Sequence, residues 1–154
     1  MTAPATFLVV EDGREYSERF ERLLGASFRF ARAGGAGEAQ AACAAGGLAG
    51  VLLDLDFRRT PAQQLIDDAG ASAAAHPDSE RRRLAGVQGI LIARFLRRAG
   101  VQLPVLLFAD LDDPDQISFL QAALGPLRVV PSSVGLQEIA GLLGQLAAGQ
   151  PRAL

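Results

Sequence analysis

The sequence predicts an α/β fold, in which a doubly wound five-stranded parallel sheet carries helices on both faces. Five short apolar runs alternate along the chain with segments whose apolar residues recur at helical spacing, as in parallel sheets with right-handed crossover helices. Three of these runs, the first, third and fourth, lead directly into acidic residues. Because the carboxyl ends of parallel strands meet at one edge of a sheet, we expect these carboxylates to gather in a single crevice.

The first half of the chain contains three predicted strands and two predicted helices. Residues 5–10 form an apolar run that ends in an acidic loop, and residues 14–24 carry apolar side chains at helical spacing. Residues 27–33 alternate between apolar and charged side chains, which is typical of a half-buried strand toward the edge of a sheet. Alanine-rich residues 38–45 predict a second helix, and residues 51–54 predict a buried third strand.

Residues 58–86 break this alternation, because they form too long a stretch for an ordinary strand-to-helix connection. We interpret them as an inserted segment that acts as a lid or as a surface for a specific partner. A helix within residues 61–75 would have a proline in its first turn and only Leu65 and Ile66 as large apolar anchors. Residues 78–83 are expected to form a solvated turn or a short helix.

Regular periodicity returns after the insertion. The predicted elements are a helix at residues 87–100, a strand at 103–109, a helix at 114–124, a strand at 127–130 and a last helix at 136–146. Ser132 and Ser133 are candidates to cap the last helix. The sequence therefore predicts five helices in all.

Length and composition predict one globular domain that is not bound to membranes. With 154 residues, 49% of them hydrophobic and 21% charged, we expect a single domain over residues 1–150 and a tail at 151–154. The longest apolar run is too short to span a bilayer, and no secretory signal precedes it, so a cytoplasmic location is expected. A net charge of −2 gives no basic face for nucleic acid. Cys43, the single cysteine, is interpreted as a packing residue.

All fifteen basic residues are arginine, so lysine chemistry is excluded throughout the chain. Without a lysine, the glycine-rich residues 34–37 cannot form a nucleotide-binding P-loop and are interpreted as a turn. His76 has no second histidine or cysteine at metal-ligand spacing, so we interpret it as a solvated loop residue.

The acids that follow the first and third strands are the candidate site. Glu11 and Asp12 come after the first strand, and Asp54 and Asp56 come at the end of the third. Such a set of carboxylates suits Mg²⁺, which prefers oxygen ligands. Like charges this close raise a carboxylate pKa, so a metal ion or an arginine should neutralise the cluster. The simpler alternative is that these acids only cap helices and keep the loops solvated.

The order of these segments resembles the receiver domain of bacterial response regulators, the CheY-like fold with strand order 2-1-3-4-5. The matching stretches are residues 7–12 (FLVVED), Asp54, residues 86–89 (GVQG), residues 104–109 (PVLLFA) and residues 129–131 (VVP). The resemblance spans nearly the whole chain. It implies that Glu11 and Asp12 hold Mg²⁺ together with Asp54 and the backbone carbonyl of Asp56. It also implies that Asp54 is the position that accepts a phosphoryl group from a histidine kinase.

The chain departs from the receiver pattern at three switch positions. Ala109 stands where the family has threonine or serine, Val130 where it has lysine, and Leu127 where it has an aromatic residue. Normal phosphorylation-dependent switching is therefore not expected. The possible substitute cations are Arg58, Arg59 and Arg128, since the first two follow Asp54 closely and the third shares a strand face with Val130.

These departures predict a stand-alone atypical receiver, or pseudo-receiver, that acts in signal transduction through protein–protein contacts and is not an enzyme. One alternative is a phosphorylatable single-domain response regulator that accepts phosphoryl from a histidine kinase on Asp54. A second alternative is a phosphatase of the haloacid-dehalogenase type, with Asp54 as nucleophile, Asp56 as general acid and residues 107–113 as the later acidic motif. The Asp-x-Asp motif of such phosphatases normally lies on the first strand, whereas Asp54 and Asp56 follow the third, which weighs against this alternative.

The last part of the chain is unusually poor in charge. Residues 116–154 contain only Arg128, Glu138 and Arg152 as charged residues. Depletion of charge is typical of interface cores, and in receivers the corresponding helix–strand–helix face carries dimer or output contacts. We therefore expect a homodimer or a signalling partner on this face, with a bland surface of alanine and glutamine as the alternative.

Overall fold

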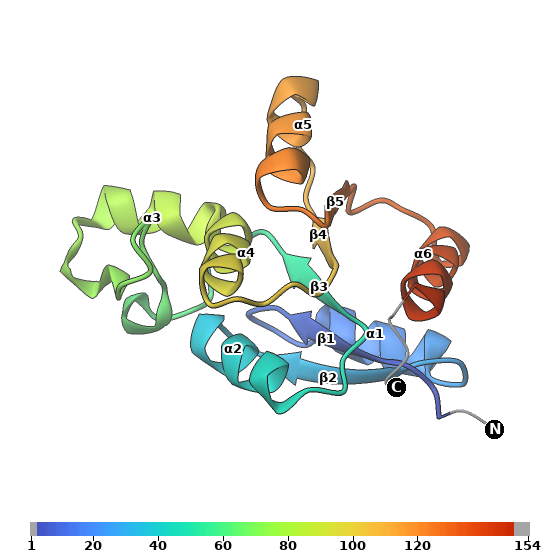
Figure 1. Cartoon of the computed structure of the whole chain (residues 1–154). Helices are drawn as coiled ribbons and strands as arrows, with labels where there is room; N and C mark the ends of the chain where they lie inside the picture. Colours follow the sequence, from blue (N-terminus) through green and yellow to red (C-terminus); the bar gives the residue numbers. More distant parts are fainter. Residues whose placement is uncertain (1–2, 150–154) are drawn as a thin grey trace.

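The computed structural model describes residues 3–149 and confirms the predicted fold class (Figure 1). A five-stranded parallel sheet has the order β2-β1-β3-β4-β5. Its strands are β1 (Thr6–Val10), β2 (Arg29–Ala33), β3 (Gly50–Asp54), β4 (Val105–Phe108) and β5 (Leu127–Val130). The prediction that residues 27–33 form an outer strand is also confirmed, because β2 pairs only with β1.

Helices cover both faces of the sheet. The six α-helices of the described residues are α1 (Glu15–Leu24), α2 (Ala36–Ala45), α3 (Asp78–Gly86), α4 (Gln88–Arg98), α5 (Pro114–Ala123) and α6 (Leu136–Ala148). Strand alternation sends Phe7 and Leu52 to the α1 and α6 face, where they pack in one apolar cluster with Phe20. Leu8 and Leu53 belong to a larger cluster on the opposite face, which includes residues of α2, α4 and α5.

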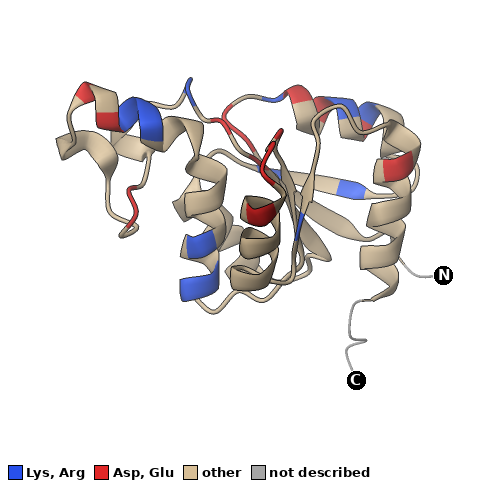
Figure 2. Ribbon diagram, turned by 90° about the horizontal axis from the view of Figure 1, so that it is seen from above, with Lys and Arg blue, Asp and Glu red and all other residues tan. Residues whose placement is uncertain are grey.

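The register of the strands brings the predicted acidic loops to one edge. Val10 pairs with Leu53 in β3, and Asp54 pairs with Phe108 in β4. The residues that follow β1, β3 and β4 therefore leave the sheet side by side. Figure 2 shows acidic loops next to arginine along this edge.

The segment between β3 and α4 is ordered differently from the prediction. The helix that residues 61–75 could contain is not formed, because the described chain makes two single 3₁₀ turns there instead, Ala62–Gln64 and Ala73–Ala75. Between them Gly70 adopts a φ of +83°, which ends any continuous helix there. Beyond them, residues 78–86 form the regular helix α3, with Asp78 and Glu80 in its first turn, where negative charge is favourable.

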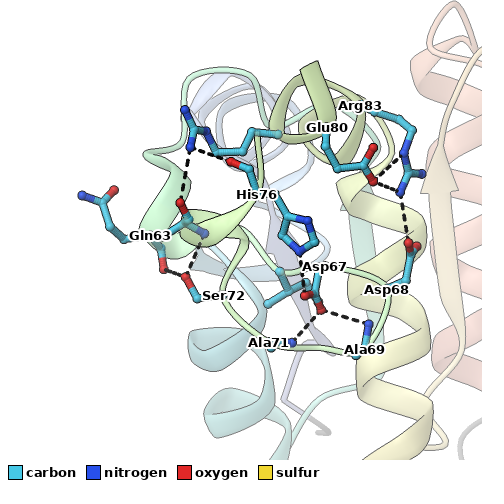
Figure 3. Close-up of polar contacts among 12 residues, drawn as sticks. Gln63, Asp67, Asp68, Ala69, Ala71, Ser72, His76, Glu80 and Arg83 are labelled. Carbon is cyan, nitrogen blue, oxygen red and sulfur yellow. Dashed lines mark hydrogen bonds and ion pairs between the residues drawn. The ribbon is translucent and has the colours of Figure 1, made fainter. Parts of the chain in front are cut away.

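Polar side chains hold this segment in place (Figure 3). The Asp67 carboxylate accepts from the backbone N–H groups of Ala69 and Ala71, and its other oxygen lies 3.0 Å from Nε2 of His76. The interpretation of His76 as a solvated loop residue is therefore wrong, since its ring is half-buried and bonded to Asp67. The hydrogen bonds of one aspartate thus shape a loop that carries few large apolar side chains.

The buried amide of Gln88 ties the same segment to α4. Its Oε1 accepts from the backbone N–H of Ile66 at 2.8 Å, and its Nε2 donates to the carbonyls of Ile66 and Leu84. Because Gln88 is buried, these bonds replace solvent at backbone groups that would otherwise be left unsatisfied. Gln88 therefore acts as the main polar link between the segment and the core.

Two further expectations are settled by the backbone. The serine caps of the last helix are wrong, because α6 begins after Gly135 and the Ser132 hydroxyl and amide bond to the Asp110 carboxylate instead. Within residues 3–149, no helix has the length and hydropathy needed to cross a membrane.

Candidate functional site

The acidic cluster consists of Glu11, Asp12, Glu15, Asp54 and Asp56. They come from the loop after β1, the first turn of α1 and the end of β3. Four of them are the acids that the sequence predicts to meet, and Glu15 joins them as the first residue of α1.

Glu11 is committed to helix α1. Its side chain is buried, at 1% exposure, with Oε1 accepting from the N–H of Tyr16 at 3.0 Å and Oε2 from the N–H of Ser17 at 2.8 Å. These amides lie in the first turn of α1, where N–H groups lack helical partners and a negative charge is favourable. The Glu11 carboxylate therefore caps the start of α1.

Asp12 is bound to Arg59. Its side chain is only 5% exposed, and its Oδ1 lies 2.9 Å from Nη2 of Arg59. The backbone N–H of Arg59 also donates to Oδ2 of Asp12, at 3.0 Å. On its other side the guanidinium donates to both oxygens of Glu15, at 2.6 and 3.0 Å. One arginine therefore joins a carboxylate after β1 to a carboxylate of α1.

These bonds shift the titration of both partners. Hydrogen bonding to Arg59 lowers the pKa of Glu15 to about 2, and the two carboxylates raise the pKa of Arg59. Both groups are thus charged over the whole physiological range. Arg59 is the predicted substitute cation that enters the acidic cluster.

Asp54 has no cationic partner in this arrangement. It is half-buried, and its Oδ1 accepts from the backbone N–H of Leu55 at 2.9 Å. The pKa of Asp54 is raised to about 6, chiefly by burial; the Leu55 amide acts to lower it, and the charges of Asp12, Asp56 and Glu11 act to raise it. Asp54 is therefore the acid of the cluster whose ionised form the fold disfavours.

The two other candidate arginines bind neither Asp12 nor Asp54. Arg58 bonds to Asp56, with its N–H donating to Oδ1 at 3.0 Å and its Nε 3.2 Å from Oδ2. Arg128 is exposed on β5, where it pairs with Leu106 of β4, in register with Leu52 rather than with the end of β3. It takes part in none of the ion pairs found among residues 3–149.

The three switch positions lie in apolar surroundings, with Ala109 directly after β4, Val130 at the end of β5 and Leu127 at the start of β5. Ala109, Leu127 and Val130 are all buried, and the N–H of Ala109 donates to the carbonyl of Val130 at 2.9 Å. On the α1 side, the ring of Tyr16 stacks on Phe108 with 5.2 Å between centroids. None of the three switch side chains can donate a hydrogen bond to a group on Asp54.

Comparisons with known proteins were made for the sequence and for the fold. No family model matches the chain, and no curated protein sequence gives a significant match. Solved structures do match. A receiver domain of a Francisella response regulator gives a TM-score of 0.66 at 12% identity, covering 94% of this chain and 97% of that one. The receiver domain of a Syntrophus aciditrophicus histidine kinase gives 0.65 at 15%, covering 97% and 95%. Vibrio cholerae chemotaxis protein CheY4 gives 0.62 at 14%, covering 94% and 99%.

This chain has the receiver-domain fold. The receiver fold is thus shared at an identity too low to carry activity across, and the roles of individual residues rest on the geometry of this chain.

A Mg²⁺ ion does not fit the acidic cluster of this receiver fold as it is arranged. Mg²⁺ requires several oxygen ligands in near-octahedral geometry. Both oxygens of Glu11 accept from α1 amides, and both oxygens of Asp12 are bonded to Arg59. Among residues 3–149, no three His, Cys, Asp or Glu side chains are placed as a metal-binding group. A metal would have to displace Arg59 first.

Two residues that support the cluster were not identified from the sequence as functional. A Cβ on Gly89 would lie 2.2 Å from the carbonyl oxygen of Asp54, and the N–H of Gly89 donates to the carbonyl of Leu55 at 2.9 Å. Only glycine permits this approach of α4 to the end of β3. Arg32 of β2 donates to the carbonyls of Gly13 and Glu11 and so fixes the loop after β1. The GVQG stretch was visible in the sequence, but its contact with Asp54 was not.

Proposed function

We propose that this chain is a signalling module with the receiver fold that works through protein–protein contact and does not depend on phosphorylation of Asp54. The observation that carries this proposal is the position of Arg59, whose guanidinium binds Asp12 and Glu15 within the acidic cluster. A cation supplied by the chain itself already neutralises the carboxylates that would otherwise attract a metal ion.

The apolar half of the edge supports the same proposal. Phosphoryl transfer depends on positive charge and hydrogen-bond donors around the transferring group. Here Ala109 and Val130 have buried apolar side chains, and no side chain of β4 or β5 forms a hydrogen bond with the Asp54 carboxylate. A phosphoryl group on Asp54 could therefore form no hydrogen bond with the side chain of Ala109 or Val130.

We place the partner contact on the face formed by α5, β5 and α6. Only Leu120 of α5 is buried, while Phe119 on the same helix is 65% exposed. Large aromatic side chains are enriched in interface cores, and Phe119 lies on the side of α5 that faces Arg94, Arg97 and Arg98 of α4. The partner is a signalling protein with a matching apolar surface, with a histidine kinase or a second copy of this chain as the specific candidates.

The test is phosphorylation with a small donor. The protein would be incubated with Mg²⁺ and acetyl phosphate, and its intact mass compared with that of Asp54→Asn. We expect no stable adduct on either protein. An adduct on the parent that is absent from Asp54→Asn would overturn the proposal and favour the phosphorylatable regulator. Turnover of p-nitrophenyl phosphate that is lost in Asp54→Asn would instead favour the phosphatase, although the bonds of Asp56 to Arg58 do not suit a general acid.

A further inference from the structure

A basic cavity lies beside the acidic cluster, in the segment between β3 and α4. Its volume is about 660 Å³. Three arginines line it, Arg58 from the loop after β3 and Arg81 and Arg82 from α3. Leu65 and Ala85, which are both buried, supply its apolar wall. Asp78 also lines it, so the cavity combines an apolar surface with three arginines and one acid, in a chain whose net charge is negative.

The arginines differ in how strongly they are already engaged. Arg81 is fixed, since it pairs with Asp78 and donates to the carbonyl of His76 at 2.7 Å. Arg58 pairs with Asp56, but 76% of its side chain is exposed. Arg82 is exposed and has no side-chain hydrogen bond or ion pair with any residue from 3 to 149. Arg82 is therefore free to bind a ligand, and Arg58 can turn toward one at small cost.

The walls of the cavity are held by the core of the protein. The N–H of Phe57 donates to the carbonyl of Ala85 at 2.8 Å, which joins the loop after β3 to α3. On the far side, Gln88 binds Ile66 and Leu84, and the His76–Asp67 pair closes the loop that follows (Figure 3). The cavity is thus largely preformed, as ligand sites usually are.

We propose that this cavity binds a phosphorylated small molecule of nucleotide size. Guanidinium groups match phosphate oxygens with paired hydrogen bonds, and their planes also stack on aromatic rings. Thr60 on the rim adds a hydroxyl group, and the apolar wall can cover the part of the ligand that carries no charge. The volume lies within the range of about 300–1,000 Å³ that small-molecule sites occupy.

This inference goes beyond the proposed function and does not depend on it. The cavity uses none of the acids of the cluster except through Arg58, whose present partner is Asp56. A ligand that draws the guanidinium of Arg58 away would break its ion pair with Asp56 and leave that carboxylate bonded only to the backbone N–H of Arg58. Binding in the cavity would then change an ion pair of the acidic cluster.

The test is a titration with ATP in the absence of divalent metal, followed by calorimetry and by amide chemical shifts, with adenosine as the uncharged comparison. We expect ATP to shift the amides of Arg58, Thr60 and Arg82, and adenosine to shift none of them. Arg82→Gln should weaken ATP binding by about tenfold, since a charge-assisted bond contributes about 1.5 kcal/mol or more. Arg22→Gln is the matched control, because Arg22 is an exposed arginine of α1 outside the cavity.

Two results would overturn the proposal. One is the absence of any shift in the cavity at about 1 mM ATP, a concentration that detects even a weak site. The other is an equal loss of affinity in Arg82→Gln and Arg22→Gln, which would show general attraction to arginine rather than a site. Asp54→Asn should bind ATP as the parent does, so this test and the phosphorylation test can fail separately.

Discussion

The carboxyl edge of the sheet has two halves that are built in opposite ways. At the ends of β1 and β3, the chain places five carboxylates and holds them with Arg59, Arg58 and the amides of α1. At the ends of β4 and β5, it places Ala109 and Val130, which are buried among apolar neighbours, and beyond them Ser132 donates to the Asp110 carboxylate. The first half is organised by charge and the second by packing.

This difference teaches where the function can lie. An acidic half on its own is able to attract a cation, but a response to phosphorylation also needs polar side chains on the opposite half. In the packed half the polar side chains at the strand ends, Asp110 and Ser132, are bonded to each other, whereas in the acidic half Arg59 joins the loops after β1 and β3 to α1. Changes to the two halves should therefore have distinct consequences for stability and for metal binding.

The largest expected effect is at the contact between α4 and the end of β3, beneath the acidic half. In Gly89→Ala, the added Cβ would meet the carbonyl of Asp54 at 2.2 Å, so α4 must move away from β3. We expect a loss of about 2–3 kcal/mol in the free energy of unfolding, measured by urea denaturation. Gly141→Ala is the control, because a Cβ there meets nothing within 4 Å, and it should be neutral or slightly stabilising. Equal losses in the free energy of unfolding for the two variants would show that α4 does not pack closely against the end of β3.

The packed half can be tested with a single hydroxyl. Val130→Thr keeps the shape of a buried side chain but places a polar group among apolar neighbours, which should cost about 1–2 kcal/mol in urea. Val129→Thr, on a half-buried neighbour, should cost less. If Val130→Thr were neutral, the end of β5 would be open to polar chemistry, and the contrast between the halves would fail.

Removing the charge of Asp54 should stabilise the protein above neutral pH. The pKa of Asp54 rises from 3.8 to about 6 on folding, so the folded state holds its proton more tightly than the unfolded state. The parent therefore loses stability as the pH rises from about 4 to 6, and the penalty is fully present above that range. We expect Asp54→Asn to gain about 1–2 kcal/mol at pH 8, allowing for solvent screening, and nothing below pH 4. Urea unfolding in a chelator at both pH values measures this, and a gain that is the same at pH 3 and 8 would exclude the titration.

The smallest effect on stability should come from Arg59→Gln. Arg59 and Glu15 are largely exposed, so the net contribution of their pair to folding is small and is screened by salt, and the part that persists in high salt comes from Asp12, whose side chain is only 5% exposed. The parent's advantage over this variant should shrink as salt rises. It should also fade as the pH drops from about 4.5 toward 2, where Glu15 takes up its proton. Thermal unfolding at low and high salt, with Arg22→Gln as the control, tests both statements.

Much of this architecture follows from the sequence, because period and position are local signals. The five apolar runs, their order and the acids at their ends are written into patterns of a few residues. The sequence does not show which arginine binds Asp12 and Glu15, since Arg58 and Arg59 are adjacent and only the path of the loop decides between them. The segment after β3 was also missed, because Gln88 and Asp67 hold it through contacts distant along the chain.

The most direct test of the account is Mg²⁺ binding by the parent and by Arg59→Gln, followed by calorimetry and by the amide shifts of Leu55 and residue 59. If Arg59 takes the place of a cation, its removal frees Asp12 and Glu15. The variant should then bind Mg²⁺ at least about tenfold more tightly than the parent, a difference of about 1.4 kcal/mol. Equal affinities in the two proteins, or tighter binding by the parent, would contradict the claim that Arg59 holds the acidic cluster in place of a metal ion.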